Sequence, residues 1–496
     1  MTLIPIPVRG RTVAADWVDE QLLAGPDGEP CLRFGAPVSR GTLRALVAER
    51  QRQLAAAGLG ELGTVALRMA PSAEFVAVLL AAWRAGARAV LLDHRLTEVE
   101  VDRAVDRLHA RLLVELVDGR PRFRQLPTAV SEGGEAMGLA AGDHALVQLS
   151  SGSTGPSKVI GRTAGDLLRE LDCYARLPEF PARGERTVLL SSTVHVLGLV
   201  GGLLHALHAG VELVVPQRMT PAGILNAIAD GAAPTTVIGV PFHAELLAAV
   251  AAPPVLPQLR RMVVAGELVR PGLPDAFRER YGVPLGTMYG MTETGVIATD
   301  LTGRHHPALQ PVHGMELSLE AGELHITRTR SPYLGLTDPT RWSAGLLHTR
   351  DAALLDPATG RVTVLGRRDS QISIGGLKVD LNEVEQTLTG LPGVVEAVVV
   401  FADGAIEAYA ATADGTSLPP SEQGGTCLPP SEQGGTSLPP SEQGGAAERL
   451  RELLGRELAG YKLPLRLHLI PQLPRTATGK LLRDVVALRR QVDSAR

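Results

Sequence analysis

The stretch of the sequence with the clearest chemical potential is a loop rich in glycine and hydroxyl side chains, Leu149-Ser-Ser-Gly-Ser-Thr-Gly-Pro-Ser-Lys158. Glycines let backbone amides approach phosphate oxygens closely, hydroxyls add donors, and the lysine adds positive charge. The residues expected to contact a polyphosphate are Ser150, Ser151, Gly152, Ser153, Thr154, Gly155 and Lys158. A Walker A loop would need glycine five residues after Gly152 with lysine next, and Ser157 stands there, so a P-loop kinase is excluded.

A second segment, Tyr289-Gly-Met-Thr-Glu293, places a hydroxyl and a carboxylate side by side on an expected turn. Gly290 permits tight geometry, and Thr292 can bond a phosphate oxygen. Glu293 can hold magnesium, a hard cation that prefers oxygen ligands. Further polar segments follow at Asp351, Gly366-Arg-Arg-Asp369, Gly375-Gly-Leu-Lys-Val379 and Pro474-Arg-Thr-Ala-Thr-Gly-Lys480. The chain has no Gly-x-Ser-x-Gly elbow, which excludes a serine hydrolase of that type.

In this order and at these separations, the segments resemble those of the adenylate-forming superfamily: acyl-CoA and aryl-CoA ligases, luciferases and nonribosomal adenylation domains. The resemblance extends from about residue 40 to residue 490. It implies that the 150–158 loop handles the ATP phosphates. It also implies the following roles: Tyr289, Gly290, Met291, Thr292 and Glu293 for adenine, phosphate and magnesium; Gly266 and Glu267 for the adenine and acyl pocket; Asp351 and Arg367 for the ribose; Lys378 for cofactor binding; Asp369 for the hinge; and Lys480 for the carboxylate and α-phosphate.

Elementary chemistry agrees with these roles. A carboxylate that attacks the α-phosphorus of ATP brings negative charge to negative charge, so catalysis must rest on positioning and on cations. Lys480, Mg2+ on Glu293 and the donor-rich loop would supply them. The predicted function is ATP-dependent formation of acyl-AMP with release of pyrophosphate. Transfer to the thiol of CoA or of carrier-protein phosphopantetheine would follow, which makes an acyl carrier protein a candidate partner.

Three alternatives stay open at the level of the sequence. Adenylation could lead to an amide, or the same scaffold could activate another oxyanion. A catalytically inactive nucleotide-binding regulator is the alternative from another class, because fold resemblance alone does not establish catalysis. Retention of Thr292, Glu293, Asp351 and Lys480 argues against the inactive protein.

The class of acid substrate is predicted from the residues of two segments. The stretch Leu149 to Thr163 is most similar to the aryl-acid branch of the superfamily. That branch has an Ala-His-Asn run where this chain has Thr193-Val-His-Val-Leu-Gly198; His195 is retained and is assigned to the acyl pocket, whereas Val196 replaces the asparagine. Salicylate and 2,3-dihydroxybenzoate are therefore disfavoured. No aspartate stands nearby to hold an α-ammonium group, so a hydrophobic or aromatic carboxylic acid is expected.

Two departures from the superfamily pattern concern positions beside these residues. Arg350 replaces the usual glycine before Asp351, and Pro156-Ser157 stands where a Pro-Lys pair is common. Neither change removes a catalytic group, but the first makes the geometry of the ribose site an open question.

The elements that must position these residues alternate between strands and helices, which predicts α/β layers with parallel strands. One helical pattern begins near Thr42 and another extends from about Ala73 to Arg84, and strand-like runs occur near Val65 and Ala87. The expected fold is a large N-terminal α/β domain with sheets flanked by helices, residues 1–366, a hinge at 367–370 and a small mobile α+β domain at 371–496. A ten-residue unit repeated three times from Ser417 predicts a flexible insert at 414–445.

Composition limits the remaining function classes. The 496 residues include 49 basic and 53 acidic side chains spread along the chain, which gives no positive field for nucleic acid. Three scattered cysteines fit neither a disulfide framework nor a metal cluster and favour the cytoplasm. The apolar segment Val194 to Val215 contains His195, His205 and Glu212, so we expect a buried element of a soluble protein and no membrane partner.

Overall fold

The computed structural model describes residues 16–127, 143–150, 158–368, 370–412, 440–474 and 481–495. The chain divides into two compact units. The first comprises 1–94, 104–150 and 158–368, and the second comprises 95–103, 151–157 and 369–496. The division between Arg368 and Asp369 falls inside the span predicted as a hinge.

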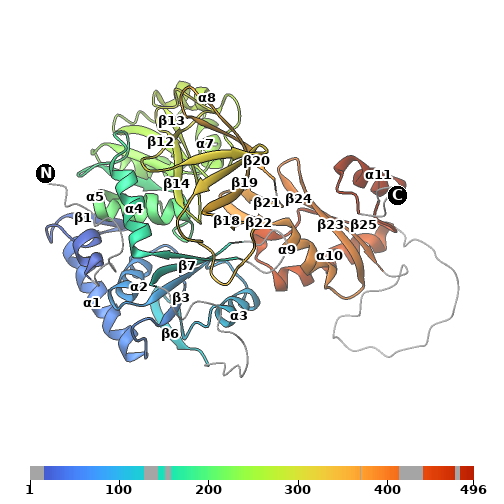
Figure 1. Ribbon diagram of the computed structural model, residues 1–496, viewed down its shortest axis with the longest axis horizontal. Coiled ribbons are helices and arrows are strands. Elements are labelled where there is room, and N and C mark those ends of the chain that lie inside the picture. Colours follow the sequence, from blue (N-terminus) through green and yellow to red (C-terminus); the bar gives the residue numbers. More distant parts are fainter. Residues whose placement is uncertain are drawn as a thin grey trace. The chain divides into compact units, whose positions relative to one another are not determined.

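The first unit contains two large sheets of mainly parallel strands (Figure 1). The nine-stranded sheet has the order β15-β14-β13-β12-β11-β9-β10-β1-β2. Its strands are β1 (Pro30–Phe34), β2 (Ala36–Ser39), β9 (Arg186–Leu189), β10 (Glu212–Val214), β11 (Thr235–Gly239), β12 (Leu259–Val264), β13 (Leu285–Met291), β14 (Gly295–Asp300) and β15 (Gln310–Pro311). The six-stranded sheet has the order β6-β5-β3-β4-β7-β8. Its strands are β3 (Thr64–Arg68), β4 (Arg88–Leu92), β5 (Leu112–Val117), β6 (Arg120–Gln125), β7 (His144–Ser150) and β8 (Lys158–Thr163). The predicted α/β layers are therefore present.

Helices cover these sheets and supply much of the core. They are η1 (Val18–Leu22), α1 (Arg40–Ala56), α2 (Ala73–Arg84), α4 (Ala164–Ala175), η3 (Leu197–Leu204), α5 (His205–Ala209), α6 (Pro221–Ala229), α7 (Pro241–Ala248) and α8 (Leu273–Tyr281). Helix α3 (Glu98–Arg107) is divided between the two units, after Arg103. Helix α2 has the bounds expected from the sequence: Ser72 caps it by accepting the backbone N–H of Phe75 at 3.1 Å. All nine residues from Phe75 to Trp83 are buried, so α2 is an inner helix and not an amphipathic surface helix.

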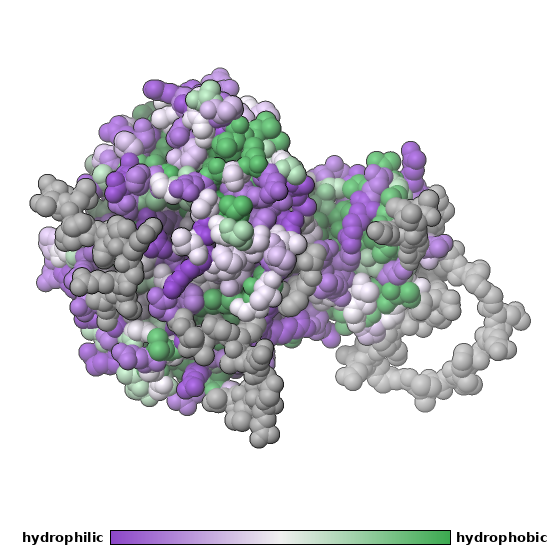
Figure 2. Space-filling model, viewed as in Figure 1, coloured by the Kyte–Doolittle hydropathy of each residue, from purple (hydrophilic) through white to green (hydrophobic). Residues whose placement is uncertain are grey.

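The apolar segment Val194 to Val215 folds as a short loop, helices η3 and α5, and strand β10, and most of its residues are buried in the main core. Both η1 and η3 are π-helices. No helix among the described residues is long and apolar enough to cross a membrane. Hydrophilic and hydrophobic residues are interspersed on the visible face of the molecule (Figure 2).

Within this core, His205 makes the stability of the first unit depend on pH. Its Nε2 lies 2.9 Å from the carbonyl of Pro181, and its ring packs edge-on against Phe180 at 4.7 Å. Burial lowers the pKa of His205 to about 4. The unfolded chain, with an ordinary histidine pKa near 6.5, therefore binds a proton at a pH where the folded chain does not.

As the pH falls from about 6.5 towards 4, protonation of this histidine in the unfolded chain should lower the free energy of unfolding. Above that window both states are neutral at His205, and the loss of stability is absent. Between pH 7 and pH 5 the free energy of unfolding should drop by about 2 kcal/mol on its account. Urea unfolding of the intact protein and of His205→Gln at the two pH values measures this effect. The variant should be less stable but less sensitive to pH, whereas His313→Gln, at an exposed position, should keep the parent pH dependence. An unchanged pH dependence in His205→Gln would contradict the assignment.

A third sheet of the first unit is antiparallel and was not foreseen from the sequence. It comprises β16 (Leu317–Glu320), β17 (Glu323–Thr327), β18 (Trp342–Ser343), β19 (Leu346–Leu355) and β20 (Val362–Arg367). Its residues share a core with Ile160 of β8 and Ile297 of β14. The sheet therefore presents β19 and β20 to the region where β13 and β14 meet.

The second unit is α+β. It contains the hairpin of β21 (Gln371–Ile374) and β22 (Leu377–Asp380), and the sheet of β23 (Val394–Ala402), β24 (Ala405–Thr412) and β25 (Arg466–Leu469). Its helices are α9 (Leu381–Thr389), α10 (Pro440–Glu457), the 3-10 turn η4 (Gly460–Lys462) and α11 (Val485–Ala495). Residues 414–439 of the expected flexible insert lie outside the described residues. Residues 440–445 form the beginning of α10, a helical start that the composition of the repeat did not predict.

Candidate functional site

Three of the predicted nucleotide-binding residues meet in one hydrogen-bonded cluster of the first unit, and Asp351 is its buried member. The Tyr289 hydroxyl, on β13, donates to Asp351 Oδ2, on β19, at 2.6 Å. Arg367 Nη1, on β20, lies 3.3 Å from Asp351 Oδ1 and also donates to the carbonyl of Thr349. Burial, and then the charge of Asp351, raise the pKa of Tyr289 well above its ordinary value, so the hydroxyl keeps its proton and stays a donor.

The backbone of Arg350, directly before Asp351, has the left-handed conformation that the glycine common at this position adopts easily. Arg350 has a φ of 64°, in the left-handed region that favours glycine. Its N–H donates to Glu323 Oε1 at 3.0 Å, and its carbonyl accepts from the N–H of Arg368. The replacement of glycine by arginine therefore leaves Asp351 paired with Tyr289 and Arg367.

The turn between β13 and β14 carries Thr292 and Glu293, and close packing fixes its ends. A Cβ on Gly290 would lie 2.7 Å from the carbonyl oxygen of Gly295, so this strand pair requires glycine there. Glu293 is buried: its Oε1 accepts the Tyr333 hydroxyl at 3.1 Å, and its backbone carbonyl accepts Arg328 Nη1 at 2.8 Å. Two residues that the sequence did not single out, Tyr333 and Arg328, thus hold the expected magnesium ligand.

A buried ion pair contacts the first residues of β14, directly after the same turn. Arg162 Nη1, at the end of β8, lies 2.6 Å from Glu170 Oε2, on α4, and each side chain is 2% exposed. Glu170 Oε1 accepts the N–H of Val296 at 3.0 Å. Gly295 has a φ of 86°, and a Cβ there would lie 2.2 Å from Glu170 Cδ. The pair therefore ties the first residues of β14 to α4, directly after the Thr292 and Glu293 turn.

The predicted phosphate loop connects two antiparallel strands. Ser150, the last residue of β7, pairs with Lys158, the first residue of β8. The register fixes both ends of the loop, and the 151–157 segment itself, with Ser151, Gly152, Ser153, Thr154 and Gly155, lies outside the described residues.

The expected acyl-pocket residue His195 lies in the loop that joins β9 to η3. Its N–H donates to the carbonyl of Ser192 at 3.2 Å, and its carbonyl accepts the N–H of Leu199 at 2.8 Å. The preceding carbonyl, of Val194, accepts Gln148 Nε2 at 2.7 Å. Gln148 stands on β7 two residues before the phosphate loop begins, so this buried amide links the loop of His195 to the strand that precedes the phosphate loop.

Other predicted residues occupy separate places. Gly266 and Glu267 follow β12, whose neighbour β13 carries Tyr289. Gly266 has a φ of 94°, a backbone conformation that favours glycine over other residues. Lys378 lies on β22 of the second unit, and its placement relative to the first unit is not determined. Asp369 and Lys480 lie outside the described residues. Their predicted roles, hinge and catalytic lysine, stay predictions.

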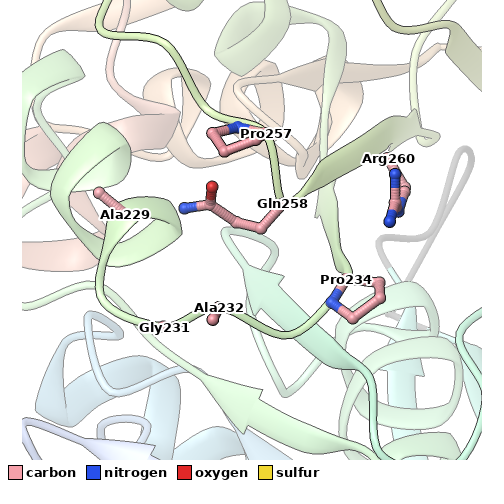
Figure 3. A pocket seen from close by; sticks show the side chains of 7 residues that line it. All are labelled: Ala229, Gly231, Ala232, Pro234, Pro257, Gln258 and Arg260. Atoms are coloured by element: carbon pink, nitrogen blue, oxygen red, sulfur yellow. The ribbon is translucent and has the colours of Figure 1, made fainter.

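A pocket of about 560 Å³ lies on the first unit away from these residues (Figure 3). Only Gln258 and Arg260, among its seven lining residues, have polar side chains, and Gln258 Nε2 is already bonded to the carbonyl of Ile228 at 2.7 Å. The pocket contains no nucleophile, general base or metal ligand and is not assigned a role.

The described site can therefore present a fixed carboxylate to a sugar hydroxyl, and a hydroxyl and a carboxylate to a phosphate and its cation. Those are the binding requirements of a nucleoside triphosphate. Such a site on two α/β sheets, followed by a small α+β unit, defines the class of adenylate-forming ligases. Comparison with known proteins agrees: the family described as AMP-binding enzyme matches residues 20–324, more than half of the chain. The chain belongs to this family and is an adenylate-forming ligase.

Relatives connect the family assignment with acid activation. A p-hydroxybenzoic acid–AMP ligase of Mycobacterium tuberculosis is 27% identical over 98% of this chain and 69% of its own length. Chondramide synthase of Chondromyces crocatus is 28% identical over 90% of this chain, which spans only 12% of that protein. Among solved structures, the o-succinylbenzoate CoA synthetase of Bacillus subtilis has a TM-score of 0.77 at 22% identity, covering 96% of this chain and 98% of its own. The function of the chain is thus the adenylation of a carboxylic acid.

Proposed function

We propose that this protein condenses a hydrophobic or aromatic carboxylic acid with ATP and then transfers the acyl group to a thiol, of CoA or of a carrier-protein phosphopantetheine. The observation that carries the proposal is the hydrogen-bonded cluster of Tyr289, Asp351 and Arg367 beside the Thr292 and Glu293 turn. In the first step a carboxylate oxygen of the acid forms a bond to the α-phosphorus, and the bond from that phosphorus to the bridging oxygen of pyrophosphate breaks. The products are acyl-AMP and pyrophosphate.

Each residue of the cluster has a distinct part in this proposal. Asp351 would accept hydrogen bonds from the ribose hydroxyls, and the donors Tyr289 and Arg367 hold its carboxylate in place. Gly266 and Glu267 would line the adenine and acyl pocket, and Lys158 would contact phosphate oxygens. Because Tyr289 and Arg367 already hold Asp351 before ATP arrives, little reorganisation of this carboxylate accompanies binding.

The residues present also fit the expected magnesium ion. Glu293 offers a carboxylate, Thr292 a hydroxyl, and Mg2+ prefers oxygen ligands combined with phosphates and water. The Tyr333 hydroxyl and the Arg328 guanidinium hold Glu293 at its side chain and backbone, which leaves the carboxylate on a fixed turn. Bound Mg2+ would neutralise charge on the phosphates.

Burial keeps the Tyr333 hydroxyl protonated, since its pKa is raised first by desolvation and then by the charge of Glu293. The Tyr333 hydroxyl is therefore the donor in its hydrogen bond to Glu293 Oε1.

The proposed class of acid rests on His195 and Val196, which stand directly before η3. Val196 offers no amide to a 2-hydroxyl group, which favours benzoate-like or other apolar acids over salicylate. The p-hydroxybenzoic acid–AMP ligase among the relatives is consistent with an aromatic acid. Transfer to the thiol would form a thioester and release AMP.

ATP–pyrophosphate exchange with a panel of acids tests this proposal. We expect exchange with benzoate, 4-hydroxybenzoate or medium-chain fatty acids and much weaker exchange with salicylate and with α-amino acids.

Asp351→Asn should raise the KM for ATP by about 10-fold or more, because the amide loses one acceptor and opposes the Tyr289 donor. Asp356→Asn, at an exposed turn on the same sheet, serves as the matched control and should leave KM unchanged.

The acceptor is tested by adding CoA, a phosphopantetheinylated carrier protein or an amine to the acid that gives the strongest exchange. Thioester formation supports the proposal, and amide formation without thioester would replace its second step. Absence of exchange with every acid, in a folded protein that binds ATP, would refute the activity.

A further inference from the structure

A cluster of two histidines and a glutamate in the antiparallel sheet is not used by the adenylation site. Glu323 and His325 stand two residues apart on β17, so their side chains leave the same face of the strand. His348, on β19, pairs directly with His325 in the register of the two strands. The centroids of the two imidazole rings are 4.3 Å apart. One potential ligand atom from each of the three residues lies within 4.8 Å of the others.

Outer contacts hold these side chains in place, as they do around bound metals. The Ser343 hydroxyl lies 2.9 Å from His348 Nε2, which fixes the orientation of that ring. Glu323 Oε1 accepts the backbone N–H of Arg350 at 3.0 Å. Glu323 and His325 are 8% and 4% exposed, so the protein pays most of their desolvation whether or not an ion binds.

Charged side chains of both signs lie around the cluster. The exposed Glu320 Oε2 lies 3.7 Å from His325 Nδ1. Arg350 Nη1 and Arg368 Nη1 lie 3.8 Å and 3.7 Å from Glu323 Oε2. The side chains of Arg350 and Arg368 are 30% and 42% exposed, so both guanidinium groups reach solvent.

We propose that Glu323, His325 and His348 form a binding site for a borderline divalent transition metal such as Zn2+. Two imidazole nitrogens and one carboxylate oxygen are ligands that Zn2+ accepts in tetrahedral sites, with water or Glu320 in the fourth position. Mg2+ would be a poor occupant because it prefers oxygen ligands in octahedral geometry. The site is therefore separate from the one expected for Mg2+ at Glu293.

Occupation of this site would have a consequence for the nucleotide cluster. The ion would cross-link β17 to β19, and Asp351 follows His348 by three residues on β19. Bound metal would stabilise the folded first unit by mass action and restrict the strand that presents Asp351.

Zinc titration of the full chain, without a histidine tag and after EDTA treatment, tests the site. We expect one Zn2+ per chain in competition with a chromogenic chelator. Replacing Zn2+ by Co2+ should give the visible absorption of a four-coordinate complex. His325→Gln and His348→Gln should each weaken binding more than about 100-fold, and Ser343→Ala, which loses only an orienting contact, by about 10-fold to 100-fold.

His313→Gln, a histidine at an exposed position of the same unit, is the matched control and should bind Zn2+ like the parent. Zinc should also raise the melting temperature of the parent and of His313→Gln, but not that of His348→Gln. If His325→Gln fails to fold, His348→Gln, at a half-buried position, and the Co2+ spectrum of the parent still decide the question. Absence of stoichiometric binding in the parent, or binding retained in both ligand variants, would overturn the proposal.

Discussion

Lys480→Ala is expected to reduce acid-dependent ATP–pyrophosphate exchange by at least about 100-fold, the scale found when one preorganised charge-stabilising group is removed. The acid and the α-phosphate both carry negative charge, and Lys480 is the cation that the family resemblance assigns to both. Lys480 is one of only four lysines in the chain, with Lys158, Lys378 and Lys462. Binding of ATP should survive, because the ribose cluster of Tyr289, Asp351 and Arg367 belongs wholly to the first unit.

Two measurements separate lost chemistry from lost folding in this variant. The shift in melting temperature caused by ATP should match that of the parent protein. Thioester formation from synthetic acyl-AMP should also continue, because the second half-reaction starts after the step that needs this lysine. Exchange close to the parent rate would remove Lys480 from the catalytic residues, and loss of both half-reactions together would point to a structural role.

Glu170→Ala is expected to lower the free energy of unfolding by about 3–5 kcal/mol, the cost of leaving one member of a buried ion pair without its partner. Arg162 and Glu170 are each 2% exposed, and within the described part of the chain the hydrogen bond that Arg162 keeps when Glu170 is shortened is the one to the carbonyl of Asp166. The N–H of Val296 also loses its acceptor, so the beginning of β14 loses its tie to α4. The KM for MgATP should rise as well, because the Thr292 and Glu293 turn ends at this point.

The matched control for this prediction is Asp172→Ala, on the same helix. Asp172 pairs with Arg176 at 2.6 Å, but the two side chains are 27% and 52% exposed, so we expect a much smaller loss of stability than for Glu170→Ala. The double variant Arg162→Leu with Glu170→Leu should recover part of the stability, because no charge is then buried alone. Urea unfolding measures all of these values. A loss for Glu170→Ala equal to that of Asp172→Ala would show that the buried pair contributes little.

The sequence by itself determined the strand and helix alternation of the two large sheets and the residue types of the expected site. Alternation of strand-like and helical patterns predicted α/β layers, and the helix expected from Ala73 to Arg84 has those bounds. Tyr289, Asp351 and Arg367 were named from their segments and lie together in the structure. Such segments are visible in the sequence because glycines, hydroxyls and charges that contact a phosphate stand within a few positions of one another. The elements are visible because buried residues recur with the period of a helix or a strand. The roles of these residues stay predictions.

Only the tertiary structure decided which distant residues support the site. Tyr333 reaches Glu293 across 40 positions, Glu170 reaches Val296 across 126, and Gln148 reaches Val194 across 46. The antiparallel sheet that pairs His325 with His348 was not predicted either. The physical reason is that strand partners and register depend on how whole sheets pack, whereas the pattern of a single strand reports only which of its faces is buried.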